Sequence, residues 1–179
     1  MTTPPSHRLP RTVLPQRYDL ELAPDLGAGR FAGTVTVDLR VVDPVDELRL
    51  NAAGLTITSA TVTAPGGLVL AGEVHVLEEL EQIVVRVPEP LGPGSRLHVS
   101  FSGALDDRLR GFYRSTFTDP DGRNHAIGAT QFEATDARRA FPCWDEPDLK
   151  AVFCLTLFVP DGLTALSSSP IAAEEPVEG

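Results

Sequence analysis

The chain has 179 residues, of which 42% are hydrophobic and 22% charged, and its formal net charge is −10 at pH 7. This length predicts one domain that can bury a sizeable core, and the composition is typical of a soluble globular protein. Phosphate binding needs clustered lysine and arginine, so the acidic balance argues against a nucleic-acid partner.

The start of the chain shows no pattern for export. The first seven residues, MTTPPSH, are polar and lack the apolar core of a signal peptide, and no apolar stretch is long enough to span a bilayer. The two cysteines, Cys143 and Cys154, could pair, but nothing indicates a disulfide-stapled scaffold. We therefore expect a cytoplasmic protein that has no membrane partner and keeps both thiols reduced.

Residues 1–12 predict a disordered lead-in, because prolines stand there among small polar residues. The segments after it alternate between apolar and polar residues, or are continuously apolar, and glycine and proline turns separate them, which is the pattern of β-strands. The expected strands are residues 18–22, 30–42, 47–51, 55–64, 68–70, 73–77, 82–87, 96–102, 111–117, 125–132 and 151–159. One short helical turn is predicted at residues 135–140, capped by Thr135 or Asp136. This order predicts an all-β, mainly antiparallel domain, built as a sandwich or a curved sheet.

Three of these strands carry further expectations. Residues 111–117 and 125–132 should form a hairpin around Asp-Pro-Asp-Gly at positions 119–122, a strong turn sequence. Residues 151–159 are dominated by valine, phenylalanine, leucine and threonine, and Pro-Asp-Gly follows them. That composition predicts a buried strand.

Between these strands, residues 130–144 combine charged, aromatic, proline and cysteine residues at a density that a plain surface loop does not have. Gln131 and Glu133 are two positions apart, so in an extended backbone both side chains point to one face while Phe132 points to the other. Such a pair at a strand end can form a recognition element. The alternative is that Glu133 pairs with Arg138 or Arg139.

The remaining residues of this stretch are interpreted as structural. Arg138 and Arg139 are expected to pair with acidic neighbours and fix the loop; the candidates are Asp136, Asp145 and Glu146. The aromatic residues should pack in the core or between domains rather than bind substrate; they are Phe141, Trp144 and Phe153. Cys143 is expected to be a buried, inert thiol and not a metal ligand.

The run TQFEATDARRAFPCWDEPDLKA at residues 130–151 is similar to the signature of the N-terminal domain of the M1 family of zinc aminopeptidases. Three further segments follow the family's order over nearly the whole chain: LPQRYDLEL at residues 14–22, FAGTVTVDL at 31–39 and LRGFYRSTF at 109–117. The resemblance implies an M1-type N-terminal domain of antiparallel, saddle-shaped sheets over residues 13–179.

The resemblance also implies a role for the paired side chains. The residue matching Glu133 helps to bind the free α-ammonium of a peptide substrate, and the residue matching Gln131 lines the pocket for the first side chain. The implied partners are a peptide N-terminus and the catalytic domain of the parent enzyme, which would hold one zinc ion. Relatives often have a proline or a cis bond after this glutamate, so the Glu133–Ala134 peptide is expected to be cis.

The chain itself lacks the family's catalytic signatures. The zinc-binding H-E-x-x-H helix needs two histidines four positions apart, whereas the four histidines here are far apart, at His7, His75, His98 and His125. The Gly-x-Met-Glu-Asn signature is missing too, since Met1 is the single methionine. We therefore expect no catalytic residue and no metal ligand in this chain, and no peptidase activity from it alone.

Compared with the family's domain, the chain is expected to stop before the last strand or two. An exposed sheet edge could then make the isolated domain dimerise. Two alternatives to an active parent enzyme stay open: an M1-like scaffold without catalysis, and a free-standing β-sandwich module that binds peptide or sugar. The unbroken TQFE run favours the catalytic parent, and an H-E-x-x-H sequence downstream would decide the matter.

Overall fold

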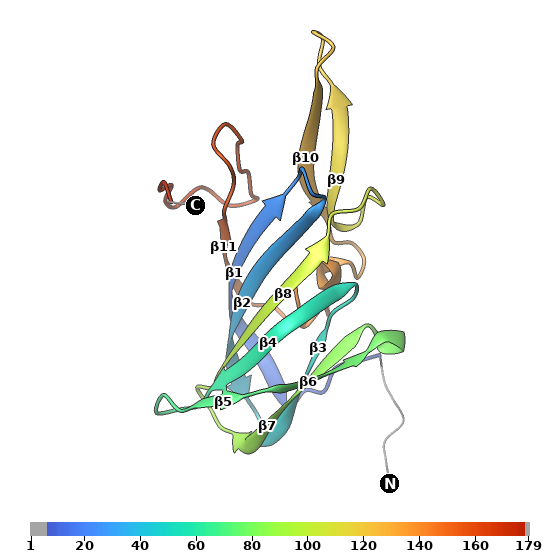
Figure 1. Cartoon of the computed structure of the whole chain (residues 1–179). Coiled ribbons are helices and arrows are strands. Elements are labelled where there is room, and N and C mark those ends of the chain that lie inside the picture. The colour runs from blue at the N-terminus through green and yellow to red at the C-terminus, as the bar shows by residue number, and fades with distance from the viewer. Residues whose placement is uncertain (1–6, 178–179) are drawn as a thin grey trace.

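The computed structural model describes residues 7–177 and shows an all-β domain (Figure 1), as predicted. Its elements in chain order are β1 (Val13–Asp25), β2 (Arg30–Val41), β3 (Val45–Asn51), β4 (Leu55–Thr63), β5 (Val69–Ala71), β6 (Glu73–Leu77), the 3-10 helix η1 (Glu78–Leu80), β7 (Gln82–Leu91), β8 (Arg96–Ala104), β9 (Gly111–Thr118), β10 (Asn124–Gln131), the 3-10 helix η2 (Ala137–Arg139) and β11 (Val152–Leu157).

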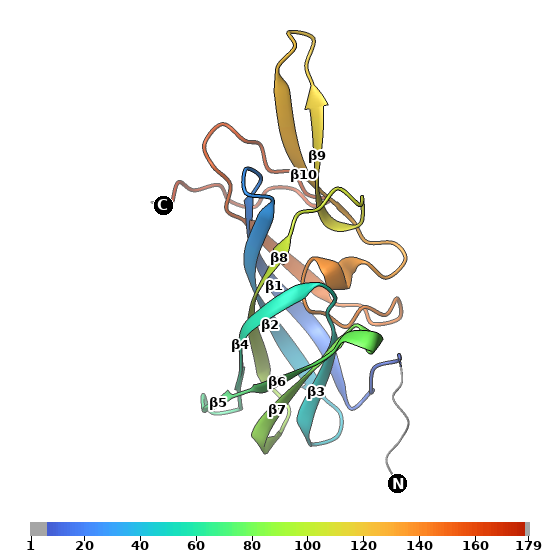
Figure 2. The same cartoon turned by 45° about the vertical axis from the view of Figure 1, so that its right-hand side comes forward.

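Three sheets make up the domain. The largest has six strands in the order β11-β1-β2-β8-β4-β5, the second has three in the order β3-β7-β6, and β9 with β10 forms a hairpin. Neighbouring strands are antiparallel except for β1 and β11, which run parallel. The three-stranded sheet lies against the lower part of the six-stranded sheet (Figure 2), so the architecture is sandwich-like.

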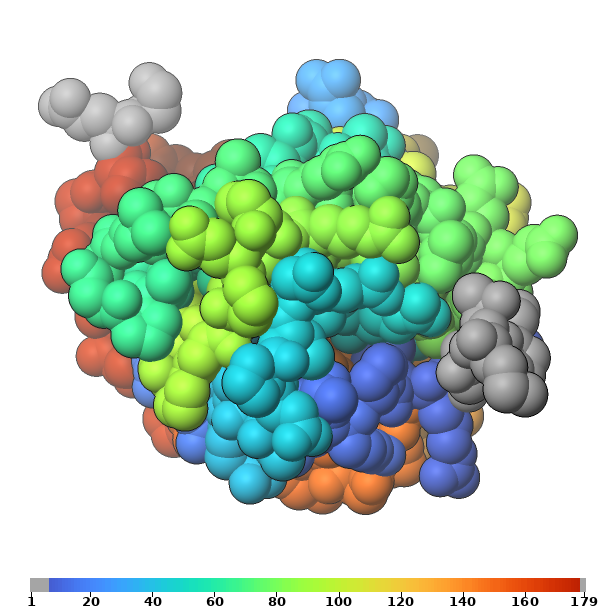
Figure 3. All heavy atoms as spheres, turned by 90° about the horizontal axis from the view of Figure 1, so that it is seen from below, coloured from blue at the N-terminus to red at the C-terminus, as the bar shows by residue number. Residues whose placement is uncertain are grey.

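The hydrophobic core lies between these two sheets. Alternation in β2 buries Phe31, Val35 and Val37 on the predicted face and leaves the intervening residues more exposed. Side chains of the second sheet, such as Leu50 and Ile83, belong to the same buried cluster. The lower end of the domain is formed by the β2–β3, β4–β5 and β7–β8 connections (Figure 3), while the β9–β10 hairpin projects from the opposite end (Figure 1).

The last strand corrects the prediction of a buried strand at residues 151–159. β11 is shorter and lies at the edge of the six-stranded sheet, where it pairs with β1 alone among the described strands. Phe153 is 57% exposed and Leu155 41% exposed. The apolar run is therefore real, but burial depends on what covers a strand, and the second sheet does not reach this edge.

The start of the chain also differs from the expected lead-in. Residues 1–6 lie outside the described residues, but Leu9 is buried in the core and its backbone N–H donates to Glu146 Oε1 at 2.7 Å. Arg11 forms an ion pair of 2.6 Å with the same carboxylate. A buried apolar side chain and several polar contacts thus hold this segment against residues far along the chain.

Candidate functional site

Gln131 and Glu133 are both exposed where the β9–β10 hairpin ends, and Phe132 between them packs against the core. The ring of Phe132 meets that of Phe141 edge-on, with 6.1 Å between the ring centroids. The Gln131 side-chain oxygen accepts a hydrogen bond of 3.1 Å from the Glu133 backbone N–H. The predicted alternation of inward and outward side chains therefore fits the burial of these three residues.

After Glu133 the chain reverses direction. The Glu133–Ala134 peptide bond is cis, as expected. The backbone N–H of Asp136 then donates to the Phe132 carbonyl oxygen at 2.9 Å, and η2 follows at once. The predicted helical turn is present, but its expected side-chain cap is not: Asp136 makes no capping hydrogen bond and binds Arg139 instead.

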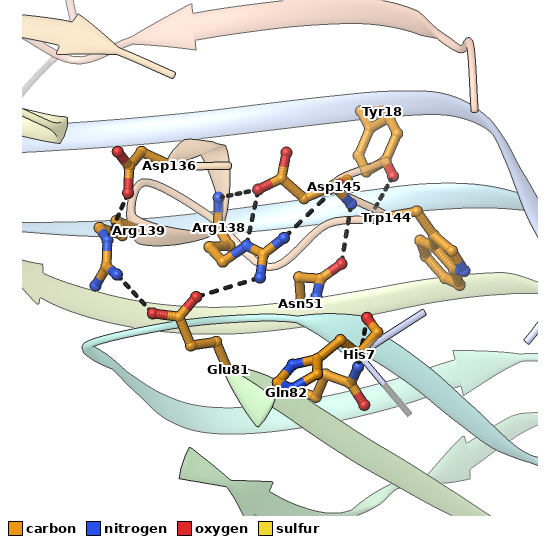
Figure 4. A network of polar contacts seen from close by, with 10 residues as sticks. All are labelled: His7, Tyr18, Asn51, Glu81, Gln82, Asp136, Arg138, Arg139, Trp144 and Asp145. Atoms are coloured by element: carbon orange, nitrogen blue, oxygen red, sulfur yellow. Dashed lines mark hydrogen bonds and ion pairs between the residues drawn. The ribbon is translucent and has the colours of Figure 1, made fainter. Parts of the chain in front are cut away.

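Arg138 and Arg139 anchor the segment through ion pairs, as predicted (Figure 4). Arg139 Nε lies 2.7 Å from Asp136 Oδ1, and Arg138 Nε lies 2.9 Å from Asp145 Oδ2. Arg138 is only 12% exposed, so this pairing is well shielded from solvent. The local acidic partners proposed from the sequence are thus confirmed for Asp136 and Asp145, whereas Glu146 pairs with Arg11.

Sequence reasoning missed a third carboxylate in this cluster, that of Glu81. Its Oε1 lies 2.5 Å from Arg139 Nη2 and its Oε2 lies 3.2 Å from Arg138 Nη1. Glu81 stands between η1 and β7, more than 50 positions before the arginines, so no local spacing could have identified it.

Glu133 does not take part in the cluster. Its carboxylate has no hydrogen bond or ion pair with any residue in the described range 7–177, and both arginines are occupied by other carboxylates. The alternative pairing of Glu133 with Arg138 or Arg139 is therefore wrong. An exposed carboxylate beside an exposed amide is free to accept hydrogen bonds from a ligand.

Backbone contacts hold the rest of the segment on the core. Asn51 and Cys143 exchange two backbone hydrogen bonds, of 2.7 and 3.0 Å, and the Asn51 side-chain oxygen accepts the Asp145 N–H at 3.2 Å. Cys143 is buried, and this burial raises the pKa of its thiol well above the ordinary value. It is therefore an inert thiol, as predicted. Cys154 is exposed and also free.

The aromatic residues of the segment have different surroundings. Phe141 and Trp144 are buried, which confirms their packing role. Phe153 is half-exposed and stacks on Tyr18, with 4.6 Å between the ring centroids. The surroundings of these three residues do not indicate an aromatic substrate-binding site.

The described residues do not fit a zinc site. Across residues 7–177 no three histidine, cysteine, aspartate or glutamate side chains are grouped so that they could hold a metal ion. His98 and His125 contact Thr36 and Asp119 instead, each at 2.8–2.9 Å. No helix in the same range has the length and apolar character needed to cross a membrane.

Comparison with known proteins gives a consistent result. A family model described as "Peptidase M1 N-terminal domain" matches residues 14–179. The chain is 46% identical over 177 residues to "Aminopeptidase M1" of Arabidopsis thaliana, covering 96% of the chain and 20% of the relative. It is 39% identical over 177 residues to "Alanine/arginine aminopeptidase" of Saccharomyces cerevisiae, with 96% and 20% covered. For "Puromycin-sensitive aminopeptidase" of Caenorhabditis elegans the identity is 38% over 171 residues, with 94% and 18% covered.

These matches extend well beyond the signature at residues 130–151 and include most of the chain. The chain spans about one fifth of the length of the curated relatives it matches. The family model covers nearly all of the chain, including β1, the hairpin and the segment that carries Gln131 and Glu133. The chain therefore belongs to the M1 peptidase family, as an M1 N-terminal domain.

Proposed function

We propose that this domain anchors the free N-terminus of a peptide for a zinc-dependent aminopeptidase of which it is a part. Glu133 would bind the α-ammonium group, and Gln131 would line the pocket for the first side chain. The observation that carries the proposal is the exposed Glu133 carboxylate, which is unpartnered among the described residues, while Arg138 and Arg139 both pair with other carboxylates. The relatives named above, all aminopeptidases, support it.

The chemistry of the two groups is complementary. An α-ammonium has three N–H donors and no acceptor, whereas an ionised carboxylate only accepts, so the hydrogen bonds between them are charge-assisted. The Gln131 side chain already accepts the Glu133 N–H, which keeps the two side chains adjacent. Recognition of a free terminus would also restrict cleavage to one residue at a time.

Zinc and the hydrolytic step are assigned to other parts of the parent enzyme, because the described residues offer no site for the metal. We expect the 179-residue chain to show no peptidase activity and to retain no stoichiometric zinc after dialysis. We also propose that the parent enzyme works in the cytoplasm. A scaffold without catalysis would have no need of Glu133.

The test is the Glu133→Gln variant of the parent enzyme, which keeps the shape of the side chain and removes its charge. A hydrogen bond to a charged group contributes about 1.5–3 kcal/mol, so kcat/KM for a peptide with a free N-terminus should fall about tenfold to a hundredfold. Zinc content and folding should stay unchanged. Glu89→Gln, the same change at an exposed position of β7, is the matched control and should have no effect.

An N-acetylated peptide provides the second arm of the test. It has no ammonium group, so its weak inhibition should be the same for the wild-type enzyme and for Glu133→Gln. Equal losses with free and acetylated ligands would show that Glu133 supports the loop rather than binding the terminus, and the proposal would be rejected.

A further inference from the structure

We infer that Glu81 is a positioning residue for Glu133. It holds both guanidinium groups of the neighbouring arginines and so keeps the Glu133 carboxylate free and in place for the ligand. This inference rests on the proposed function, because it concerns how the same anchoring site is built.

The backbone of Glu81 is the first part of the argument. Glu81 has φ 51° and ψ 46°, in the left-handed region. Glycine adopts this conformation at a lower free energy than any residue with a side chain. A glutamate in such a position is therefore explained by contacts of its side chain, which a glycine cannot make.

Glu81 is also firmly attached to the core of the domain. Its N–H donates to the Glu78 carbonyl oxygen at 3.0 Å, and its own carbonyl oxygen accepts the Ala52 N–H at 2.9 Å. The next residue, Gln82, is fully buried at the start of β7. The carboxylate of Glu81 consequently extends from a fixed point on the three-stranded sheet.

From that point the carboxylate reaches both arginines, with one oxygen on each (Figure 4). Arg138 is also fixed by its backbone, since its carbonyl oxygen accepts the Ala53 N–H at 3.0 Å. The side chain of Arg139 has no such second anchor: its other partner, Asp136, belongs to the same loop. Among the described residues, Glu81 therefore makes the one ion pair that joins the Arg139–Asp136 pair to the rest of the domain.

The connection from Arg139 to the candidate site is short. Asp136 binds the Arg139 guanidinium with its side chain and the Phe132 carbonyl oxygen with its N–H, and Phe132 directly precedes Glu133. A displacement of Arg139 would therefore also move the turn that carries Glu133.

Charge balance gives Glu81 a second effect on Glu133. The two arginines face three carboxylates, those of Glu81, Asp136 and Asp145, so the cluster has no surplus positive charge. Without the Glu81 charge, each guanidinium group keeps one carboxylate partner, and the N–H donors that Glu81 occupied become available to another carboxylate. Glu133 is six positions from Arg139 in the chain, and its capture would remove the ligand-binding group.

The experiment is a double-mutant cycle in the parent enzyme with Glu81→Gln, Glu133→Gln and the combination. Glu81→Gln should raise KM and lower kcat/KM about three- to tenfold for a peptide with a free N-terminus, with kcat less affected. In the Glu133→Gln background the same change should have little further effect, because Glu81 acts through Glu133. Inhibition by the N-acetylated peptide should not change.

Two further variants separate positioning from folding. Glu79→Gln changes the same charge on the same turn, at an exposed residue without an ion pair in the described range, and should behave like the wild type. Glu81→Gly suits the left-handed backbone, so relief of backbone strain should offset part of the stability lost with the ion pairs, and the domain should still fold while KM rises.

Each other outcome would overturn the inference. If Glu133→Gln impairs the enzyme but Glu81→Gln does not, the proposed function stands and the positioning role is rejected. Equal losses from Glu81→Gln in both backgrounds would identify a general structural role. If Glu133→Gln itself has no effect, the proposed function and the positioning role are both rejected.

Discussion

The hydroxyl oxygen of Tyr18 accepts a hydrogen bond of 3.1 Å from the backbone N–H of Trp144, 126 positions later in the chain. Tyr18 is 2% exposed and lies in β1, whereas Trp144 belongs to the irregular segment that follows Glu133. This bond therefore ties the segment to the six-stranded sheet, as Glu81 ties it to the three-stranded sheet.

Tyr18→Phe should lower the free energy of unfolding by about 1–3 kcal/mol, because the buried Trp144 N–H loses its partner. The ring itself and its stacking on Phe153 would be kept. Urea denaturation with an unchanged dependence on denaturant is the measurement. Tyr113→Phe removes a hydroxyl from a partly exposed tyrosine of β9 and should change stability by less than about 0.5 kcal/mol. Equal effects of the two changes would contradict the assignment.

Stability should also fall at high pH. Burial raises the pKa of Tyr18 and that of Cys143 far above their ordinary values. In the unfolded chain these groups ionise near pH 10 and about 8.5, while in the folded protein they stay protonated, so the unfolded state loses protons first and is favoured. Each group should thus reduce stability by up to about 1.4 kcal/mol per pH unit above its unfolded pKa.

The check on this pH dependence is the free energy of unfolding measured between pH 7 and 11. Tyr18→Phe should flatten the curve above pH 10, and Cys143→Ala should flatten it from about pH 8.5. Cys154→Ala, the same substitution at the exposed cysteine, is the matched control. A wild-type curve that is flat to pH 11 would contradict the prediction.

The sequence pattern predicts the buried residues correctly where burial follows from local alternation. It fails where burial depends on residues that are distant in the chain. In β2 the apolar residues at every second position identified the buried face, since one side of that strand must face the core. The apolar run of β11 has the same composition as a buried strand, but no pattern within it shows that the second sheet ends before it.

The candidate site divides in the same way. The pairing of Arg138 and Arg139 with Asp136 and Asp145 could be predicted, because each arginine is within seven positions of its acidic partner. Glu81 could not, because 58 positions separate it from Arg139 and only the packing of the two sheets brings them together. A role for Glu133 in binding came from the family resemblance, while its exposure and its lack of a partner within residues 7–177 came from the structure.

We predict that η2 can pack against the start of β9 only if residue 111 is a glycine. Gly111 has φ +66°, and a Cβ built on it would lie 2.5 Å from Arg139 Cβ. Gly111→Ala should therefore destabilise the domain by both backbone strain and collision. Gly122, in the turn of the hairpin, has φ +81° and no atom within 4 Å of such a Cβ, so Gly122→Ala isolates the strain alone.

Left-handed backbone costs a residue with a side chain about 1–2 kcal/mol, so both variants should lose at least that much stability. Gly111→Ala should lose a further 1–3 kcal/mol or so, as expected for overpacking. Thermal or urea denaturation of the two variants gives the difference directly. Equal losses would show that the Arg139 backbone moves aside without cost.

The exposed edge of β11 is predicted to make the 179-residue chain self-associate. The strand Val152–Leu157 has no charged residue and no proline, the two features that usually protect a sheet edge. Leu155 is paired in register with buried Leu20 of β1, so it lies on the core side of the sheet yet remains 41% exposed. A second copy could cover this side chain and pair with the free backbone groups of β11.

Light scattering over a range of protein concentrations should thus show a dimer that forms as concentration rises. Leu155→Lys should keep the chain monomeric, because the lysine charge would be buried without a partner in the dimer. Leu166→Lys is the matched control: Leu166 is 81% exposed and lies outside the strand, so the same substitution there should leave dimerisation intact. A wild-type chain that stays monomeric at millimolar concentration, or an equal effect of both lysines, would rule out association through β11.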